Sequence, residues 1–291
     1  SLYESMESNG SVSLKALFDG ETEIDNFSTL TIEQIAFAIV RGGWPASIGE
    51  SEKIALRHAI DYVEAIINAD VSRVDGIEKN PVRVRALLRS LSRNISTLAT
   101  IRTIHDDIAM GDADESISEK TISQYLGALD RIFVTENLPA WNPALRSKTA
   151  IRTSPKRQFV DPSIAAAVMR LTPSRLLEDF NYFGFLFESL CDRDLRIYAE
   201  AIDGQVFHYR DGSGLEADAV IALNDGRWAA VEVKLGSKEI EDAAVHLLEL
   251  KNKVNTEKMR EPSFLMILTG TEIAYRREDG VYVVPLGCLK D

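Results

Sequence analysis

Charged and apolar residues alternate along two consecutive strand-like segments of the chain. In the first segment, alternation with a period of two places Glu216 and Asp218 on one face. In the second it places Glu232 and Lys234 together. Two carboxylates at cross-strand distance repel each other unless a proton or a cation intervenes, and a divalent ion with oxygen ligands is the usual resolution. The pattern therefore predicts a metal site at which a water is activated and a lysine orients that water or holds a phosphate.

The turn between the two segments decides whether their acidic faces coincide. A three-residue loop at 224–226 pairs Asp218 with Glu232, because an odd loop length gives that register. A two-residue loop would pair Asp218 with Val233 and separate the carboxylates. We expect the three-residue loop, with Gly226 supplying the left-handed position. Glu-x-Lys alone is common in strands, so a half-exposed strand face without chemistry is the alternative interpretation.

Periodicity also predicts the elements that position these residues. Apolar residues at helical spacing from Leu176 to Leu190 predict a long amphipathic helix. Strands are expected at 205–210, 215–223 and 227–235, a helix at 239–255, a buried strand at 263–269, and a hairpin at 273–285 that turns at Asp279-Gly280. The C-terminal part therefore has the order helix, three strands, helix and strand.

The first half of the chain has helical periodicity. Two helices are expected between 31 and 68, joined by a turn in which Trp44 is a packing anchor. Three shorter helices are expected after them: one opens at Pro81, one is capped by Ser96 or Thr97, and one begins at Ser118.

Three short helices followed by extended, proline-containing sequence are typical of a winged helix. The third helix, 118–133, is then the candidate recognition helix. Its exposed face carries polar side chains that can reach phosphates or base edges: Lys120, Thr121, Ser123, Gln124 and Arg131. A winged helix that only packs against its neighbours has the same pattern, so both interpretations stay open.

The charge balance limits the function classes. A net charge of −12 and a pI near 5.0 argue against a protein that coats nucleic acid through a broad basic surface. Two local basic patches remain, and each can be a solvated face or a phosphate site. They comprise Arg83, Arg85, Arg89 and Arg93, and Arg146, Lys148, Arg152, Lys156 and Arg157.

The remaining composition gives mostly negative expectations. The cysteines and histidines are scattered and form no zinc spacing: Cys191, Cys288, His58, His105, His208 and His246. The sequence has no apolar run near the roughly 18 residues of a membrane span and no signal-peptide pattern, so we expect a cytoplasmic protein without a membrane partner. Because the chain opens with Ser1 rather than methionine, we expect a fragment of a longer protein.

The chain resembles the PD-(D/E)XK nuclease superfamily in its order of elements, in Asp218 and in Glu232-Val233-Lys234. In that superfamily such residues on the second and third strands bind the metal. The resemblance implies an α+β chain that ends in a restriction-endonuclease-like α/β domain with a mixed central sheet and Mg²⁺ or Mn²⁺ as cofactor. It also implies that Glu188, on the preceding helix, is the further metal-binding carboxylate that many members carry. The chain departs from the pattern in having no proline before Asp218.

More closely, nearly the whole chain resembles the part of a prokaryotic AAA+ ATPase family that follows the nucleotide-binding core. The matching motifs are Ser1-Leu2-Tyr3-Glu4-Ser5, Arg41-Gly42-Gly43-Trp44-Pro45, Thr121-Ile122-Ser123-Gln124-Tyr125-Leu126, Phe187-Glu188, Glu216-Ala217-Asp218 and Val231-Glu232-Val233-Lys234. In that family a helical lid and a winged helix precede a nuclease-like domain, domain of unknown function 4143. The resemblance implies a lid-like segment at 1–75, a winged-helix-like domain at 76–153 and a PD-(D/E)XK nuclease-like domain at 154–291.

These features leave three hypotheses. The first is a divalent-metal phosphodiesterase that acts on DNA or RNA, guided by the winged helix and driven by the N-terminal ATPase domain of the longer protein. The second is a nuclease fold without activity that serves as a DNA- or protein-docking platform for the ATPase. The third is a structural role in a homo-oligomer of the ATPase. The chain has no Gly-Lys dipeptide and therefore no P-loop, so we expect no ATP site in it.

Overall fold

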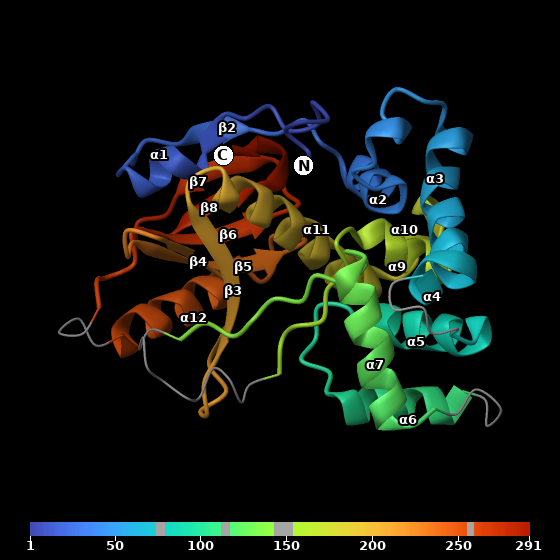
Figure 1. The fold of residues 1–291 in the computed structure, drawn as a ribbon. Coiled ribbons are helices and arrows are strands. Elements are labelled where there is room, and N and C mark those ends of the chain that lie inside the picture. Colours follow the sequence, from blue (N-terminus) through green and yellow to red (C-terminus); the bar gives the residue numbers. More distant parts are fainter. Residues whose placement is uncertain (74–78, 112–116, 143–153, 255–258) are drawn as a thin grey trace. The chain divides into compact units, whose positions relative to one another are not determined.

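A computed structural model describes residues 1–73, 79–111, 117–142, 154–254 and 259–291 (Figure 1). Contacts divide the chain into two units. Unit 1 comprises Ser1–Ile35, Leu190–Asp291 and the described part of Pro139–Thr153, and unit 2 comprises Ala36–Leu138 and Ser154–Ser189. This division cuts across the three modules expected from the sequence, because 1–35 packs in the unit of the C-terminal strands and 154–189 packs among helices.

The centre of unit 1 is a seven-stranded mixed sheet. Across the sheet the strands are β2 (Asp25–Phe27), β7 (Ile273–Arg276), β8 (Tyr282–Pro285), β6 (Leu265–Thr269), β5 (Trp228–Lys234), β4 (Glu216–Leu223) and β3 (Gly204–Arg210). Strands β5, β6 and β8 are mutually parallel, and the other neighbours are antiparallel. The expected strands, the order of elements and the β7–β8 hairpin are confirmed, with Gly280 at φ 88° in its turn.

Two long helices belong to the C-terminal region: α11 (Phe180–Glu200) and α12 (Ile240–Lys253). The helix at 239–255 is confirmed, whereas the helix expected from Leu176 to Leu190 is divided: Leu176 and Leu177 belong to the short α10 (Pro173–Leu177), and α11 starts at Phe180 and continues to Glu200. Helix α12 packs against β4, β5 and β6 (Figure 1). Trp228 and Ala230 of β5 lie in one buried cluster with Ala243 and Leu247 of α12. Because side chains alternate along a strand, the next residue on this face of β5 is Glu232. The strand that carries the apolar core therefore also carries the acid.

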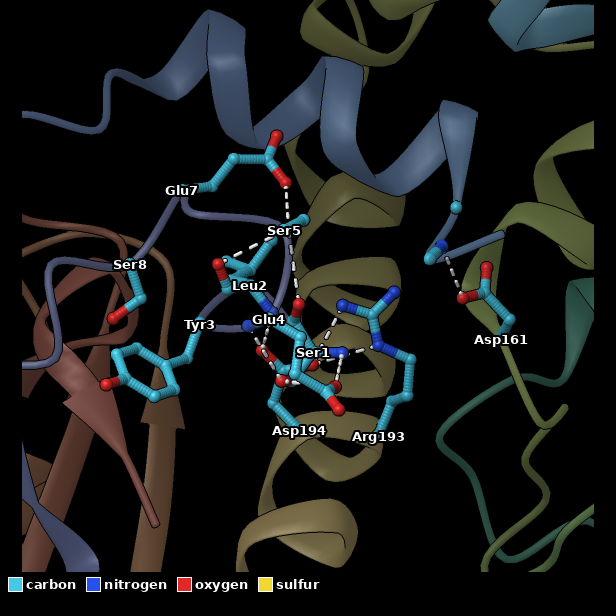
Figure 2. Close-up of polar contacts among 12 residues, drawn as sticks. Ser1, Leu2, Tyr3, Glu4, Ser5, Glu7, Ser8, Asp161, Arg193 and Asp194 are labelled. Atoms are coloured by element: carbon cyan, nitrogen blue, oxygen red, sulfur yellow. Dashed lines mark hydrogen bonds and ion pairs between the residues drawn. The ribbon is translucent and has the colours of Figure 1, made fainter. Parts of the chain in front are cut away.

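The N-terminal segment adds short elements to unit 1. They are β1 (Val12–Ser13) and α1 (Leu14–Phe18). At the other end of the chain, the 3₁₀ turn η4 (Leu286–Cys288) leads into β9 (Leu289–Lys290), which pairs in parallel with β1. The backbone N–H of Leu2 donates to Asp194 Oδ2 at 2.9 Å (Figure 2). Asp194 is fully buried on α11, and Arg193 compensates it with an Nη2 to Oδ1 distance of 2.8 Å. This buried ion pair anchors the N-terminal segment to α11.

Unit 2 is built mainly from helices. They are α2 (Ile32–Arg41), whose last six residues belong here, η1 (Pro45–Ser47), α3 (Glu52–Ala65), η2 (Ile66–Asp70), α4 (Val71–Arg73), α5 (Pro81–Arg93), α6 (Ile101–Gly111), α7 (Glu119–Arg131), α9 (Pro162–Val168), α10 (Pro173–Leu177) and the start of α11. Asn80 caps α5 and Ser118 caps α7 through their side chains. Among the described residues, no helix of either unit has the length and apolar content to cross a membrane.

The expected cap of α6 is wrong. Ser96 has φ 58° and its hydroxyl donates to the Phe185 carbonyl, so it belongs to the turn after α5. Helix α6 begins later, where the Thr100 hydroxyl accepts the N–H of Thr103. Both threonine and serine can cap a helix, and the sequence did not distinguish between them.

Antiparallel bridges follow α7, at Thr135–Phe159 and at Leu138–Lys156. Three helices and then an antiparallel pair is the order expected for a winged helix. The winged-helix assignment itself stays a prediction.

A glycine turn ends α2. Gly42 has φ 79°, the N–H of Gly43 donates to Asp161 Oδ2 at 2.9 Å, and Trp44 Nε1 donates to Ser163 Oγ at 2.9 Å (Figure 2 labels Asp161). The Trp44 ring also lies 4.7 Å from the ring of Tyr62, centroid to centroid. Trp44 is therefore a packing anchor, as expected.

We predict that Gly42→Ala destabilises the protein more than Gly49→Ala. Both glycines have a positive φ, so either alanine costs about 1–2 kcal/mol of backbone strain. At Gly42 an added Cβ would also lie closer than 3.0 Å to Ser163, Trp44 and Asp161, whereas at Gly49 it meets nothing within 4 Å. Crowding should add about 1–3 kcal/mol at Gly42 alone. Urea denaturation measures both losses, and equal losses would contradict the packing described for this turn.

Candidate metal centre

The hairpin between β4 and β5 has the expected register. The N–H of Leu223 donates to the Arg227 carbonyl at 2.8 Å, and Gly226 has φ 85°. Ala219 pairs with Val231 in the ladder, and one further step along this register brings Asp218 opposite Glu232. The three-residue loop is therefore confirmed, and it brings the two carboxylates to one face of the sheet.

Three of the expected site residues contact one another. Lys234 Nζ lies 2.9 Å from Glu232 Oε2 and 3.5 Å from Asp218 Oδ2. Asp218 Oδ2 also accepts the backbone N–H of Val233 at 2.8 Å, which fixes the carboxylate over β5. One ammonium thus lies between two carboxylates, so its single positive charge cannot neutralise both acids.

Glu232 is the buried member of this group. The residue is 3% exposed, whereas the side chains of Asp218 and Lys234 are 20% and 22% exposed. Burial and, next, the neighbouring Asp218 carboxylate together raise the pKa of Glu232 to about 8, although Lys234 opposes the shift. Its Oε1 atom is buried and accepts no hydrogen bond from any described residue. A buried oxygen without a donor is costly, and a cation or a proton would satisfy it.

The three residues open onto a cavity of about 380 Å³ within unit 1. Helix α12 lines its other side with His246, Glu249 and Lys253, and Glu216 of β4 lies at its edge. Lys253 Nζ in turn holds the β3–β4 loop, at 3.0 Å from Asp211 Oδ2. The pKa of Asp211 lies well below its usual range because Ser213 and Lys253 donate hydrogen bonds to it.

Sequence reasoning missed the contribution of α12. His246, Glu249 and Lys253 are spaced at i, i+3 and i+7, which places them on one face of a helix. That spacing was visible, but only the packing of α12 over β5 shows that this face borders the acids. From the sequence alone, His246 is only one of the scattered histidines that form no zinc spacing.

Glu188, the fourth expected site residue, lies in unit 2. In that unit its Oε1 atom lies 2.5 Å from Lys156 Nζ, and both side chains are largely buried. Its approach to Asp218 and Glu232 stays a prediction. Lys156 belongs to the second basic patch of the sequence, whose Arg146, Lys148 and Arg152 lie outside the described residues.

The candidate recognition helix α7 buries its expected apolar face and exposes Lys120, Ser123, Gln124 and Arg131. The Thr121 hydroxyl lies 3.0 Å from that of the capping Ser118, and Arg131 Nε donates to the Gly127 carbonyl at 3.0 Å. Of the five side chains expected to contact nucleic acid, Thr121 and Arg131 therefore contact their own helix or its cap. Their contact with nucleic acid stays a prediction.

The donor set of the sheet site suits a small, hard cation. Within the described residues, no group of three or more histidine, cysteine, aspartate or glutamate side chains has metal-binding geometry. Mg²⁺ is commonly held by one or two carboxylates, with waters and substrate oxygens completing its six positions. Asp218 and the Oε1 atom of Glu232 provide two carboxylate ligands, so these residues fit Mg²⁺ or Mn²⁺.

We predict that the buried carboxyl makes metal-free stability fall as pH rises. The folded pKa of Glu232, about 8, is above the ordinary value of 4.5, so protonation favours the fold. Its contribution is complete below pH 4.5 and is lost as pH rises through 8, by up to about 1.4 kcal/mol per pH unit. Urea denaturation with chelator between pH 5 and 8 measures this slope. Glu232→Gln should flatten it and the exposed control Glu239→Gln should not; an unchanged slope in Glu232→Gln would refute the burial argument.

Comparison with known families finds two matches along the chain. Residues 32–175 are similar to a domain of unknown function (DUF8612), and residues 183–289 are similar to a domain of unknown function (DUF4143). No curated protein and no solved structure matches the chain. The DUF4143 match contains Glu188, Asp218, Glu232 and Lys234 together with β3 to β8 and α12. All four expected site residues therefore lie in one family region for which no activity is described.

Proposed function

We propose that unit 1 is a divalent-metal-dependent phosphodiesterase of the PD-(D/E)XK type that acts on nucleic acid. The observation that carries the proposal is the buried Oε1 atom of Glu232, which accepts no hydrogen bond from the described residues and lies beside a second carboxylate. A fold that retains such an atom on a central strand loses stability unless a ligand compensates it. The ligand best suited to two carboxylates is a divalent cation.

Asp218 and Glu232 are the proposed metal ligands. When bound, Mg²⁺ or Mn²⁺ would supply Lewis-acid stabilisation of the negative charge that develops on a phosphate. Deprotonated Glu232 is the form that binds a cation, so binding must displace the proton that its raised pKa retains near neutral pH. Metal affinity should therefore increase as pH rises toward 8.

Lys234 is the proposed contact to the substrate. Its Nζ atom now compensates both acids, and a bound cation would release it from this role. An ammonium carries three donors and no acceptor, so it can hold a phosphate oxygen or orient an attacking water. His246 and Lys253 also line the cavity and are the proposed further contacts to a polyanion.

Nucleic acid is the proposed substrate class because most residues that line the cavity are charged or polar, and the cations Lys234 and Lys253 are among them. The exposed face of α7, with Lys120, Thr121, Gln124 and Arg131, is proposed to guide the strand as part of a winged helix. In a longer protein, an AAA+ ATPase domain would gate or drive this activity.

We predict that Mn²⁺ stabilises the 291-residue chain, by about 2.7 kcal/mol at a hundredfold excess over its dissociation constant. Asp218→Asn and Glu232→Gln should each abolish the gain, since both keep the shape but remove the charge. Glu239→Gln should keep the gain in stability, because Glu239 is an exposed acid. Thermal denaturation with and without Mn²⁺ measures the effect, and an unchanged melting temperature in the unsubstituted protein would exclude the metal site.

We predict further that Lys234→Ala keeps the stabilisation by Mn²⁺ but cleaves at least about tenfold more slowly, since it loses one charge-assisted contact to the phosphate. The assay uses supercoiled plasmid DNA and a folded RNA in separate reactions. Metal binding without cleavage of either substrate would support the inactive docking platform instead. Cleavage that Lys234→Ala does not slow would show that the activity arises elsewhere.

A further inference from the structure

Unit 2 contains a cavity of about 530 Å³, unrelated to the acidic site. Its floor is aliphatic and includes Val40, Val63, Ile67 and Leu171. Ile60, which is 39% exposed, lies on the same face of α3 and extends the apolar surface toward solvent. A volume of this size is in the range of small-molecule sites, which are roughly 300–1,000 Å³.

Four arginines surround this floor: Arg57, Arg85, Arg89 and Arg170, with Glu64 as the acid that lines the cavity. Arg85 holds Glu64 through two hydrogen bonds of 3.0 Å. Arg57 pairs with Asp61 on the outside of α3. The side chains of Arg89 and Arg170 form no hydrogen bond and no ion pair with the described residues, although Arg170 helps to lower the pKa of Glu64. In a chain of net charge −12, this is a local excess of positive charge.

The position of Arg170 adds to the argument. The N–H groups of Arg170 and Leu171 close the end of α9 on Ala167 and Ala166, and Arg170 itself has φ 54°. This is the helix end at which glycine is the usual residue, because a side chain is strained there. The fold thus holds an arginine side chain at the cavity in a backbone conformation that glycine would adopt without strain.

We propose that this cavity binds a small amphiphile that has an anionic headgroup, a phosphate or a carboxylate, on an aliphatic chain. Arg89 and Arg170 would contact the headgroup, because a guanidinium matches the oxygens of either anion with paired donors. The aliphatic floor would contact the chain. No aromatic side chain lines the cavity within the described residues, so it offers no stacking surface for the base of a nucleotide or a single strand.

The test is calorimetry of the full chain with decyl phosphate and with decanoate, both below their micelle concentrations. Each should bind with one-to-one stoichiometry, and the tighter of the two identifies the headgroup. Decanol has the chain without the charge and inorganic phosphate has the charge without the chain, so both should bind at least about tenfold more weakly. If inorganic phosphate binds as tightly as decyl phosphate, the aliphatic floor contributes nothing and the proposal is wrong.

Variants locate the binding. Arg89→Gln and Arg170→Gln should each weaken decyl phosphate binding about tenfold, the loss of one charge-assisted contact. Arg83→Gln is the matched control, because Arg83 is exposed on the same helix as Arg89 but does not line the cavity. Circular dichroism checks that the variants fold. Equal affinity in all variants would show non-specific association and overturn the proposal, as would the absence of saturable binding.

Discussion

The candidate centre depends on one constraint, a carboxylate on a central strand of the sheet. Glu232 belongs to β5, which has β4 and β6 as its neighbours, and it is almost fully buried. An acid in that environment is expensive unless a proton or a cation compensates it. The register of the β4–β5 hairpin adds Asp218 and thereby increases the repulsion, while Lys234 offsets only part of it. Without a compensating charge the arrangement lowers stability, and this cost is the basis of the proposed metal site.

In each unit, taken by itself, side chains of like charge line a cavity. The cavity of unit 1 brings carboxylates together, and the cavity of unit 2 brings arginines together. In unit 1 this raises the free energy of the empty site, because two carboxylates approach each other in a partly desolvated volume. The two ligands inferred from them have opposite charge: a divalent cation for the first and an anionic amphiphile for the second. The acidic net charge of the whole chain gives no indication that the two cavities differ in charge.

Local sequence rules predicted the parts that depend on neighbouring residues. The alternation of charged and apolar residues and the odd loop length predict how β4 pairs with β5. A capping serine followed by apolar residues at helical spacing predicts α7. Long-range packing decided the rest. Nothing near Asp194 in the sequence indicates that it is fully buried and binds the N–H of Leu2, and the partner of Glu188, Lys156, is 32 residues away. The polar face of α12 borders the acids because the helix packs on β4, β5 and β6, and that packing is not encoded in the spacing of its polar residues.

The most direct test of the central claim is anomalous diffraction from crystals of the chain that contain Mn²⁺. The account predicts a peak at coordination distance from a carboxylate oxygen of Asp218 and from Oε1 of Glu232, with the Lys234 ammonium displaced from between the two acids. The account would be contradicted by a map in which Lys234 still bridges the acids and no anomalous peak lies between them. Such a map counts if the crystal was soaked at saturating Mn²⁺ or shows a fully occupied Mn²⁺ site elsewhere.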